Sequence, residues 1–322
     1  MKKILITGGS GFIGSHLVKY FVSKKYNVAI TTKYNSIFEN IRLASVWNKI
    51  KVIETDLRNY DTLFKINKFN PNIIFHLAAY NDVGGSFLNQ SESLTSNLIS
   101  TSNLLDTLKN YEQFIYISTS EIYGYQTKVP FVETMMPQPL SPYSIGKYSG
   151  ELYSQMHMRF YNKPIKIIRP FNAYGPGQSM KAVIPELIIK CLKNEKIETT
   201  EGNQTREFNY VEDLVNGFVK CASEKKAFGE IFNIGSNYEI KIKDLVYIIH
   251  KLCNSNSKIA IGALKKRKTD ISRMKSNYNK FSKISGWKPK FKLIDGLKLT
   301  IDWYKDYLEI VEKPESGIQK IF

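Results

Sequence analysis

The chain has 322 residues, 43% apolar and 23% charged, a composition typical of a globular protein with room for a substantial core. Its apolar runs are too short for a membrane span, and its three cysteines form no CxxC pair, so we expect no membrane contact and a reduced, cytoplasmic setting. The net charge of +17 is carried mostly by Lys and comes without a nucleic-acid recognition motif, and the four histidines lack ligand spacing. We therefore expect neither a nucleic-acid partner nor a structural metal.

The first predicted strand ends in a glycine-rich turn. Residues 4–6 are an apolar run that suits a buried parallel strand, and a helical pattern follows the turn TGGSGFIG at 7–14. Glycines at Gly8, Gly11 and Gly14 let the backbone approach a pyrophosphate at a helix N-terminus, with Phe12 and Ile13 in the same turn. The strand before and the helix after support a dinucleotide-binding motif over a plain turn.

Strand-like and helix-like segments then alternate. Strands are predicted at 28–31, 52–54, 73–77, 114–118 and 165–169, and helices at 61–69, 92–109 and 143–161. This rhythm predicts an α/β fold with a Rossmann-type, doubly wound parallel sheet, whose ligands bind beyond the carboxyl ends of the strands. The second strand ends in TTKYNS at 31–36 without an acidic residue, and Lys33 there favours the 2′-phosphate of NADP.

The rhythm loosens after residue 170. A helix is predicted at 185–193, a strand and helix at 230–234 and 242–252, and a last helix at 293–311. We expect residues 1–170 to form the dinucleotide-binding domain and residues 171–322 mainly a smaller, interleaved substrate-binding domain. Part of the segment 230–255 is expected to return to the sheet or to pack beside it.

Two stretches carry chemistry: STSEIYG at 118–124, at a predicted strand end, and SPYSIGK at 141–147, which opens a helix. Tyr143 and Lys147 are four apart and share one helix face. An ammonium beside a phenol lowers the pKa of the phenol and makes it a base for a hydroxyl proton. Two other Tyr-x-x-x-Lys pairs occur, but only Tyr143 follows a hydroxyl-rich strand end that includes Thr119.

Together these motifs resemble the extended short-chain dehydrogenase/reductase superfamily, and within it the nucleotide-sugar 4,6-dehydratases of the NAD-dependent epimerase/dehydratase family. The likeness spans nearly the whole chain, and beyond the turn and the two stretches above it includes DLR at 56–58, HLAA at 76–79, RPFNAYGPGQS at 169–179, TREFNYVEDL at 205–214, Arg267 with Asp270, and GWKPKFKLIDGL at 286–297.

The resemblance implies roles for four residues. Tyr143 would deprotonate the C4 hydroxyl of a nucleotide-linked hexose, Lys147 would tune it and hold the nicotinamide ribose, and Thr119 would bond the C4 oxygen. Glu121 would remove the C5 proton, after which water leaves C6. The product implied is a 4-keto-6-deoxy sugar, formed through transient oxidation with no net use of NAD(P).

The resemblance also implies binding residues. Asp56, Leu57 and Ala78 would join the glycine turn and Lys33 around the cofactor, while Asn172, Arg206 and Arg267 would hold the substrate diphosphate. Ser86 is expected near the sugar or cofactor, and Ser120 stands where dTDP-glucose dehydratases carry an aspartate. Relatives with a similar run after the second strand use NAD, so the choice between NAD and NADP leans slightly to NAD.

Glu121 separates the possible activities. Simple C4 epimerases of the superfamily place a small or apolar residue there, whereas UDP-glucuronate decarboxylases share the Thr-Ser-Glu run. The contexts SPYSIGK and QSMKAVIP (178–185) resemble dehydratases more, especially those acting on nucleotide-linked N-acetylglucosamine. A C4 epimerase, a decarboxylase and a non-catalytic dinucleotide-binding scaffold remain the alternatives. A homodimer is implied, paired through helices around 91–110 and 143–161.

Overall fold

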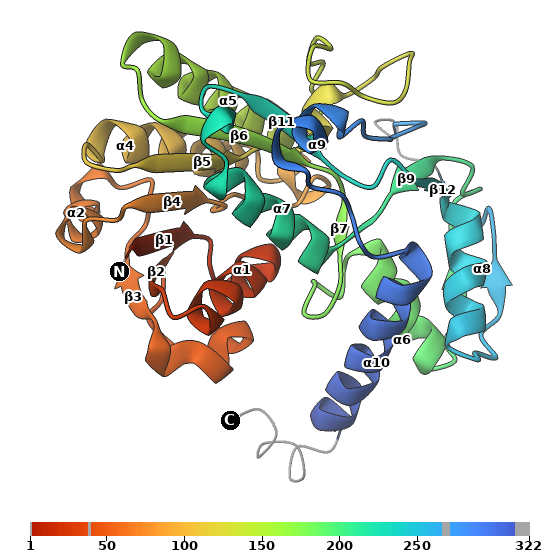
Figure 1. Ribbon diagram of the computed structural model, residues 1–322. Helices are drawn as coiled ribbons and strands as arrows, with labels where there is room; N and C mark the ends of the chain where they lie inside the picture. The colour runs from red at the N-terminus through yellow and green to blue at the C-terminus, as the bar shows by residue number, and fades with distance from the viewer. Residues whose placement is uncertain (1, 38–39, 266–270, 313–322) are drawn as a thin grey trace.

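A seven-stranded parallel sheet forms the centre of the protein in the computed structural model, which describes residues 2–37, 40–265 and 271–312 (Figure 1). Neighbouring strands are parallel and lie in the order β11-β6-β5-β4-β1-β2-β3. This confirms the predicted doubly wound fold. The strands are β1 (Lys3–Thr7), β2 (Asn27–Thr32), β3 (Lys51–Glu54), β4 (Ile73–His76), β5 (Gln113–Ile117), β6 (Ile165–Pro170) and β11 (Ile231–Ile234).

The central strands are apolar throughout because both faces of the sheet are covered. In β1, Ile4 and Ile6 enter the core on one face while Leu5 enters the core on the other, and all three are fully buried. The chain order reverses between β1 and β4, whose ends Thr7 and His76 lie in register. Such a reversal opens a crevice at the carboxyl ends of the strands, where ligands of this architecture bind.

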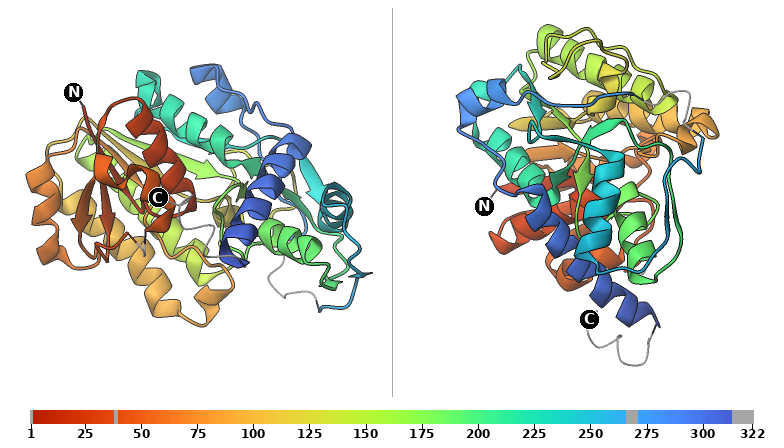
Figure 2. Two further views of the ribbon diagram at one scale, coloured as in Figure 1. Left: turned by 90° about the horizontal axis from the view of Figure 1, so that it is seen from below. Right: turned by 90° about the vertical axis from the view of Figure 1, so that its right-hand side faces the viewer.

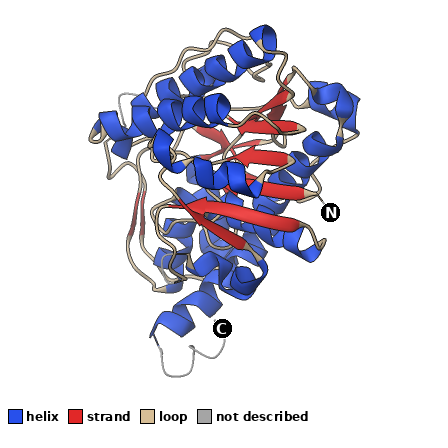
Figure 3. Cartoon of the chain, turned by 90° about the vertical axis from the view of Figure 1, so that its left-hand side faces the viewer, coloured by secondary structure: helices blue, strands red, loops and turns tan. Residues whose placement is uncertain are grey.

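Helices pack on both sides of the sheet (Figures 2 and 3). One face is covered by α1 (Phe12–Ser23) and α7 (Val211–Ser223), together with a 3₁₀ helix at Ile41–Lys49 that the sequence did not suggest. The other face is covered by α2 (Phe64–Phe69), α4 (Ser100–Thr107) and α5 (Pro142–Phe160).

The helix predicted over 92–109 is interrupted. It consists of α3 (Gln90–Leu94), a π-helical turn at Thr95–Ile99 and α4. A π turn inserts one residue into the helical repeat and changes where the side chains project. Within it, the Asn97 side chain accepts from the backbone N–H of Tyr80 at 2.9 Å and donates to its carbonyl at 3.1 Å. The loop after β4 is thereby tied to this helix.

A second, smaller group of elements surrounds its own apolar core beside the sheet (Figure 2). Its helices are α6 (Val183–Leu192), α8 (Ile242–Leu252) and α10 (Leu293–Glu312). Three short two-stranded sheets complete it: β7 (Ala173–Tyr174) with β10 (Asn209–Tyr210), β9 (Thr205–Glu207) with β12 (Glu239–Lys241), and β8 (Ile197–Glu198) with β13 (Ile259–Ala260).

The chain passes between the two groups more than once. Strand β11 pairs with β6 in the central sheet, and α8, which follows it, packs against α6 in the smaller core. The domain division at residue 170 stays a prediction. Among the helices of the described residues, none combines the length and apolar content needed to cross a membrane.

Candidate active site

A cleft of about 680 Å³ lies between the carboxyl ends of the central strands and the smaller group of elements. Its walls join segments that are distant in the sequence: the glycine turn before α1, the end of β5, the start of α5, and side chains from α6 and β9. The predicted site residues that line it are Gly8, Gly11, Phe12, Ile13, Gly14, Thr119, Ser120, Glu121, Tyr143, Lys147, Asn172 and Arg206. A second cavity, of about 660 Å³, is lined by Tyr60, Phe64 and Tyr111 among others and by none of these residues.

The glycine turn forms a cradle that only glycine allows. Gly8 has a φ of +66°, and a Cβ built there would lie 2.7 Å from the backbone nitrogen of Ala78. A Cβ on Gly14 would lie 2.2 Å from the Gly8 carbonyl oxygen. The bare turn brings the first amides of α1 to the cleft wall, where they suit a diphosphate. These residues therefore fit the pyrophosphate of a dinucleotide.

Thr119 and Glu121 follow the end of β5 and line the cleft. Thr119 is extended and caps the 3₁₀ turn Ser120–Tyr123, because its hydroxyl accepts the backbone N–H of Glu121 at 3.2 Å. Glu121 is half-buried and lines the cleft. Ser120 lines it too, although its hydroxyl is directed at the sulfur of Met274, 3.5 Å away.

Helix α5 begins at the same place. Ser141 and Ser144 form a capping box and Pro142 occupies the first turn, which fixes the direction of the helix. Tyr143 then lines the cleft together with Thr119, whose side chain is near enough to lower the pKa of the Tyr143 phenol. Lys147, one turn later, donates to the carbonyl of Ile117 at 2.5 Å.

The pKa of Tyr143 is shifted in the direction opposite to the one that the sequence predicts. Burial raises the pKa of Tyr143 to about 12, and the nearby Glu121 carboxylate raises it as well, while the nearby Thr119 side chain opposes them. Burial also lowers the pKa of Lys147 to about 7, against the attraction of Glu151. In the protein alone the pKa of Tyr143 is therefore raised, not lowered as Lys147 was expected to do, because Lys147 is directed at a strand carbonyl and burial lowers its own pKa.

A buried ion pair that sequence reasoning missed lies behind this wall. Arg169, at the end of β6, binds Glu151 of α5 at 2.6 Å, and their side chains are 3% and 0% exposed. Glu151 also accepts the hydroxyl of Ser118 at 2.6 Å, while Arg169 donates to the Tyr123 hydroxyl at 2.9 Å. A sequence signal existed: Glu151 lies four residues after Lys147 and so continues its helix face.

Of the residues predicted to bind the substrate, only some line the cleft. Arg206 reaches the cleft while donating to the carbonyls of Thr205 at 2.8 Å and Ile271 at 2.5 Å. Asn172 lines the cleft and donates to the carbonyl of Glu207 at 3.2 Å. Ser86 does not reach it, because its buried hydroxyl donates to the carbonyl of Val83 at 2.7 Å. Arg267 lies outside the described residues.

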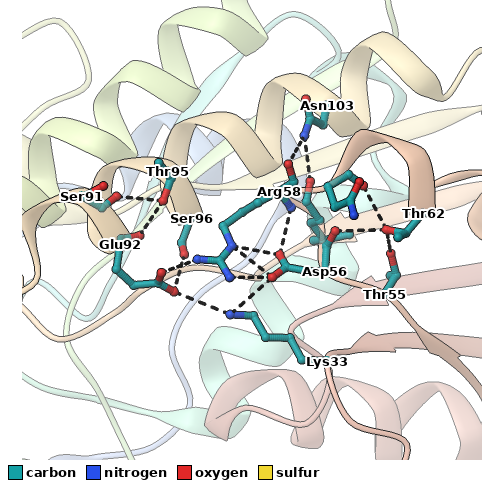
Figure 4. Close-up of polar contacts among 12 residues, drawn as sticks. Lys33, Thr55, Asp56, Arg58, Thr62, Ser91, Glu92, Thr95, Ser96 and Asn103 are labelled. Carbon is teal, nitrogen blue, oxygen red and sulfur yellow. Dashed lines mark hydrogen bonds and ion pairs between the residues drawn. The ribbon is translucent and has the colours of Figure 1, made fainter.

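The remaining cofactor candidates lie near the turn but outside the cleft wall. Ala78 abuts Gly8, and Leu57 is buried beneath the second helix layer. Lys33 and Asp56 form a cluster with Arg58 and Glu92 beyond the ends of β2 and β3 (Figure 4). Within the described part of the chain, no group of three or more His, Cys, Asp or Glu is arranged to hold a metal ion.

The fold and the cleft define a dinucleotide-binding α/β protein of the Rossmann type, and comparisons with known proteins give its family. The family model described as GDP-mannose 4,6 dehydratase matches residues 5–300, so the chain belongs to that family. The dTDP-D-glucose 4,6-dehydratase of Homo sapiens is 33% identical over 334 residues, covering 99% of this chain and 94% of the human protein.

Solved structures of an epimerase and of a dehydratase share the fold of this chain. The UDP-glucose 4-epimerase of Thermotoga maritima with UDP-glucose has a TM-score of 0.88 at 29% identity, covering 95% of this chain and 99% of its own. The dTDP-glucose 4,6-dehydratase of Bacillus anthracis in complex with NAD has a TM-score of 0.84 at 25% identity, covering 96% and 98%. The family and these neighbours support an enzyme that binds an NAD(P)-type dinucleotide and a nucleotide sugar.

Proposed function

We propose that the protein is a 4,6-dehydratase that converts a nucleotide-linked hexose to its 4-keto-6-deoxy form. The observation that carries the proposal is the position of Glu121. Its half-buried carboxylate lines the same cleft as Tyr143 and Lys147 and is close enough to raise the pKa of the Tyr143 phenol. Abstraction of a C5 proton requires a general base beside the sugar, a role that the Glu121 carboxylate can fill, whereas C4 epimerisation requires no base at C5.

Tyr143 and Glu121 each carry out one of the proton transfers of the reaction. Tyr143, which lines the cleft beside Thr119, accepts the C4 hydroxyl proton while Thr119 holds the C4 oxygen. When bound, NAD supplies the acceptor and donor for the hydride of this internal redox chemistry. The C4 ketone acidifies C5–H, and Glu121 takes that proton; loss of the C6 hydroxyl as water follows. Since Ser120 provides no acid, Glu121 returns its proton to the departing oxygen. The C5=C6 double bond left behind is saturated by return of the hydride to C6 and by a solvent proton at C5, while Tyr143 releases its proton to solvent, so the overall reaction releases one water and leaves the dinucleotide as it began.

The substrate is a nucleoside diphosphate hexose, with an N-acetylglucosamine type among the candidates. Arg206 lies on the cleft wall as a fixed charge for phosphate oxygens, and Asn172 lies beside it. The roles of Arg267 and Ser86 stay predictions. We propose NAD as the dinucleotide, as in the neighbour from Bacillus anthracis.

We also propose a cytoplasmic homodimer. The helical segments 90–107 and 142–160 lie against each other and leave apolar side chains at the surface, each at least 39% exposed: Leu94, Ile99, Ile145 and Leu152. An apolar face of this kind is buried when two copies pair through it.

The test uses substrate turnover in heavy water. Nucleotide-linked hexoses, with glucose and N-acetylglucosamine on UDP, GDP, CDP and dTDP, are incubated with the protein and followed by mass spectrometry and NMR. A dehydratase yields a product lighter by one water with deuterium at C5. Glu121→Gln is expected to cut turnover by about 10²- to 10⁴-fold with unchanged dinucleotide affinity. Glu112→Gln, which lies just before β5 at the amino-terminal end of the strands and away from the cleft, serves as the control.

A C4 epimerase is the second candidate, because the neighbour from Thermotoga maritima has that activity in its name. Epimerisation without loss of water and without deuterium at C5 would establish it and overturn the dehydratase proposal. Full dehydration by the Glu121→Gln variant would remove Glu121 from the mechanism.

A further inference from the structure

A buried carboxylate lies directly beside Arg206 in β9. The side chain of Glu207 is fully buried, and its oxygens accept three hydrogen bonds from two serines. Ser236 donates its backbone N–H at 2.5 Å, and Ser276 donates both its backbone N–H at 2.7 Å and its hydroxyl at 2.8 Å. The contact is close, because a Cβ on Gly235 would lie 2.0 Å from the same carboxylate. Glu207 therefore joins β9 to the turn after β11 and to the segment that ends at Ser276.

Residues 271–276, which we call the strap, hold three residues of the cleft wall: Ser120, Asn172 and Arg206. The carbonyl of Ile271 accepts the Nη1 of Arg206 at 2.5 Å. The buried sulfur of Met274 accepts the Ser120 hydroxyl and the Asn172 amide, each at 3.5 Å. The position of the strap therefore decides where these three side chains lie.

Several contacts hold the strap, and the one with Glu207 is the most costly that a side chain makes. Carbonyls of the strap also accept the backbone N–H groups of Thr205 at 2.9 Å and Phe131 at 2.7 Å, and the exposed Arg273 binds Glu239 of β12. An exposed ion pair contributes little. Loss of Glu207 as an acceptor would instead leave two backbone N–H groups and a hydroxyl unpaired inside the protein. Backbone donors cannot rotate away, so the strap must shift to reach another acceptor.

We propose that Glu207 is a positioning residue for the substrate: by seating the strap, it holds Arg206 where a nucleoside diphosphate binds. Glu207 does not itself line the cleft, so it acts through the strap and not by contact with the substrate. This role rests on the proposed function, in which Arg206 binds the substrate diphosphate.

The physical reason is the precision that phosphate binding requires. A guanidinium binds phosphate oxygens through N–H groups in a fixed fork, so a shift of its anchor misdirects the fork even though the charge remains. Strand β9 belongs to the smaller group of elements, whereas the glycine turn follows β1 of the central sheet. A shift of the strap is therefore expected to weaken diphosphate binding and to leave dinucleotide binding unchanged.

The experiment measures two affinities of the full chain by isothermal titration calorimetry, after removal of copurified nucleotides. One is the affinity for NAD⁺, and the other is the affinity for UDP, GDP, CDP and dTDP in the presence of saturating NAD⁺. Glu207→Gln replaces one acceptor oxygen by an NH₂ group that faces other donors. It is expected to weaken binding of the best-bound diphosphate by about tenfold and to leave the NAD⁺ affinity within about twofold.

Asp213→Asn is the matched control. Asp213 is another buried carboxylate that accepts two backbone N–H groups, those of Lys290 at 2.9 Å and Phe291 at 3.0 Å, and it does not line the cleft. The substitution makes the same carboxylate-to-amide change and is expected to lower the midpoint of urea unfolding as Glu207→Gln does. It should leave the diphosphate affinity unchanged, which separates positioning from a general loss of stability.

A double-mutant cycle tests whether Glu207 acts through Arg206. Arg206→Ala alone should weaken diphosphate binding, and adding Glu207→Gln should weaken it by less than about twofold more. Ser276→Ala keeps the backbone N–H and removes only the hydroxyl donor to Glu207, so it perturbs folding less. It should weaken diphosphate binding by about threefold, and it decides the outcome if Glu207→Gln does not fold.

Three results would overturn this role while leaving the proposed function intact. They are an unchanged diphosphate affinity in Glu207→Gln and Ser276→Ala, an equal loss in Asp213→Asn, and losses that multiply in the cycle. An unchanged affinity in Arg206→Ala would overturn both this role and the assignment of the diphosphate to Arg206. Binding of none of the four diphosphates would overturn the proposed function as well.

Discussion

The two ionic clusters of this protein use the same chemical groups in opposite surroundings. The Arg169–Glu151 pair is sealed behind the end of β5, with side chains 3% and 0% exposed. The cluster of Lys33, Asp56, Arg58 and Glu92 lies at the edge of the sheet and is at least 30% exposed at every member.

The difference teaches what each cluster contributes. Charges taken out of water must be paired and hydrogen-bonded, so the buried pair holds β6, α5 and the Ser118 end of β5 in one geometry. Charges that keep water nearby contribute little to stability, but they remain available to a ligand. The buried pair therefore fixes the wall of the cleft that carries Thr119 and Tyr143, and the exposed cluster keeps its charges accessible at the edge of the sheet.

The largest expected effect is the loss of one partner of the buried pair. Arg169→Met leaves Glu151 as an uncompensated buried carboxylate, and we expect the free energy of unfolding to fall by about 3–5 kcal/mol. The double variant Arg169→Met/Glu151→Leu should recover much of this loss. Urea unfolding followed by circular dichroism measures both, and a single variant within about 1 kcal/mol of the unaltered protein would break the comparison.

An effect that is smaller per pH unit is expected from the pH dependence of Lys147, which lies one helical turn before Glu151 and lines the cleft. Its pKa is about 7 in the folded protein against 10.5 ordinarily, because burial disfavours the charged form. Between these values the unfolded chain binds a proton that the folded protein lacks, so stability rises with pH by up to about 1.4 kcal/mol per unit.

Lys147→Met should remove this rise. The measurement compares the free energies of unfolding of Lys147→Met and the unaltered protein from about pH 6.5 to about pH 9.5, a range that lies mostly between the two pKa values. If the free energies of unfolding of the two proteins change with pH in parallel, Lys147 keeps its proton when buried. The attraction of Glu151 would then outweigh the cost of burying the charge.

The smallest effect on stability is expected at the exposed cluster of Lys33, Asp56, Arg58 and Glu92. Glu92→Gln should change the free energy of unfolding by about 1 kcal/mol or less, and Glu112→Gln, which loses an exposed pair with Lys2, by about 0.5 kcal/mol or less. We therefore expect the two variants to be nearly as stable as the unaltered protein. A loss of several kcal/mol in Glu92→Gln would assign the edge cluster a structural role like that of the buried pair.

Much of the fold was predictable because strong local patterns agree with the tertiary structure. The apolar strands, the glycine turn and the start of α5 are each specified by neighbouring residues, and α8 occurs at Ile242–Leu252 as the periodicity predicts. The helix at 92–109 was predicted as continuous, but periodicity does not reveal a π turn whose Asn97 side chain bonds a distant loop.

Part of the candidate site was likewise predictable from the sequence, and part of it was not. Tyr143 and Lys147 on one helix face and the polar end of β5 follow from the sequence alone, since helical repeat and strand direction are local properties. The pKa values of the two residues, the pairing of Glu151 with Arg169, and the neutralisation of Lys33 by Glu92 were decided only by the tertiary structure. Burial and electrostatic interaction depend on which distant segments meet, and no local pattern records that.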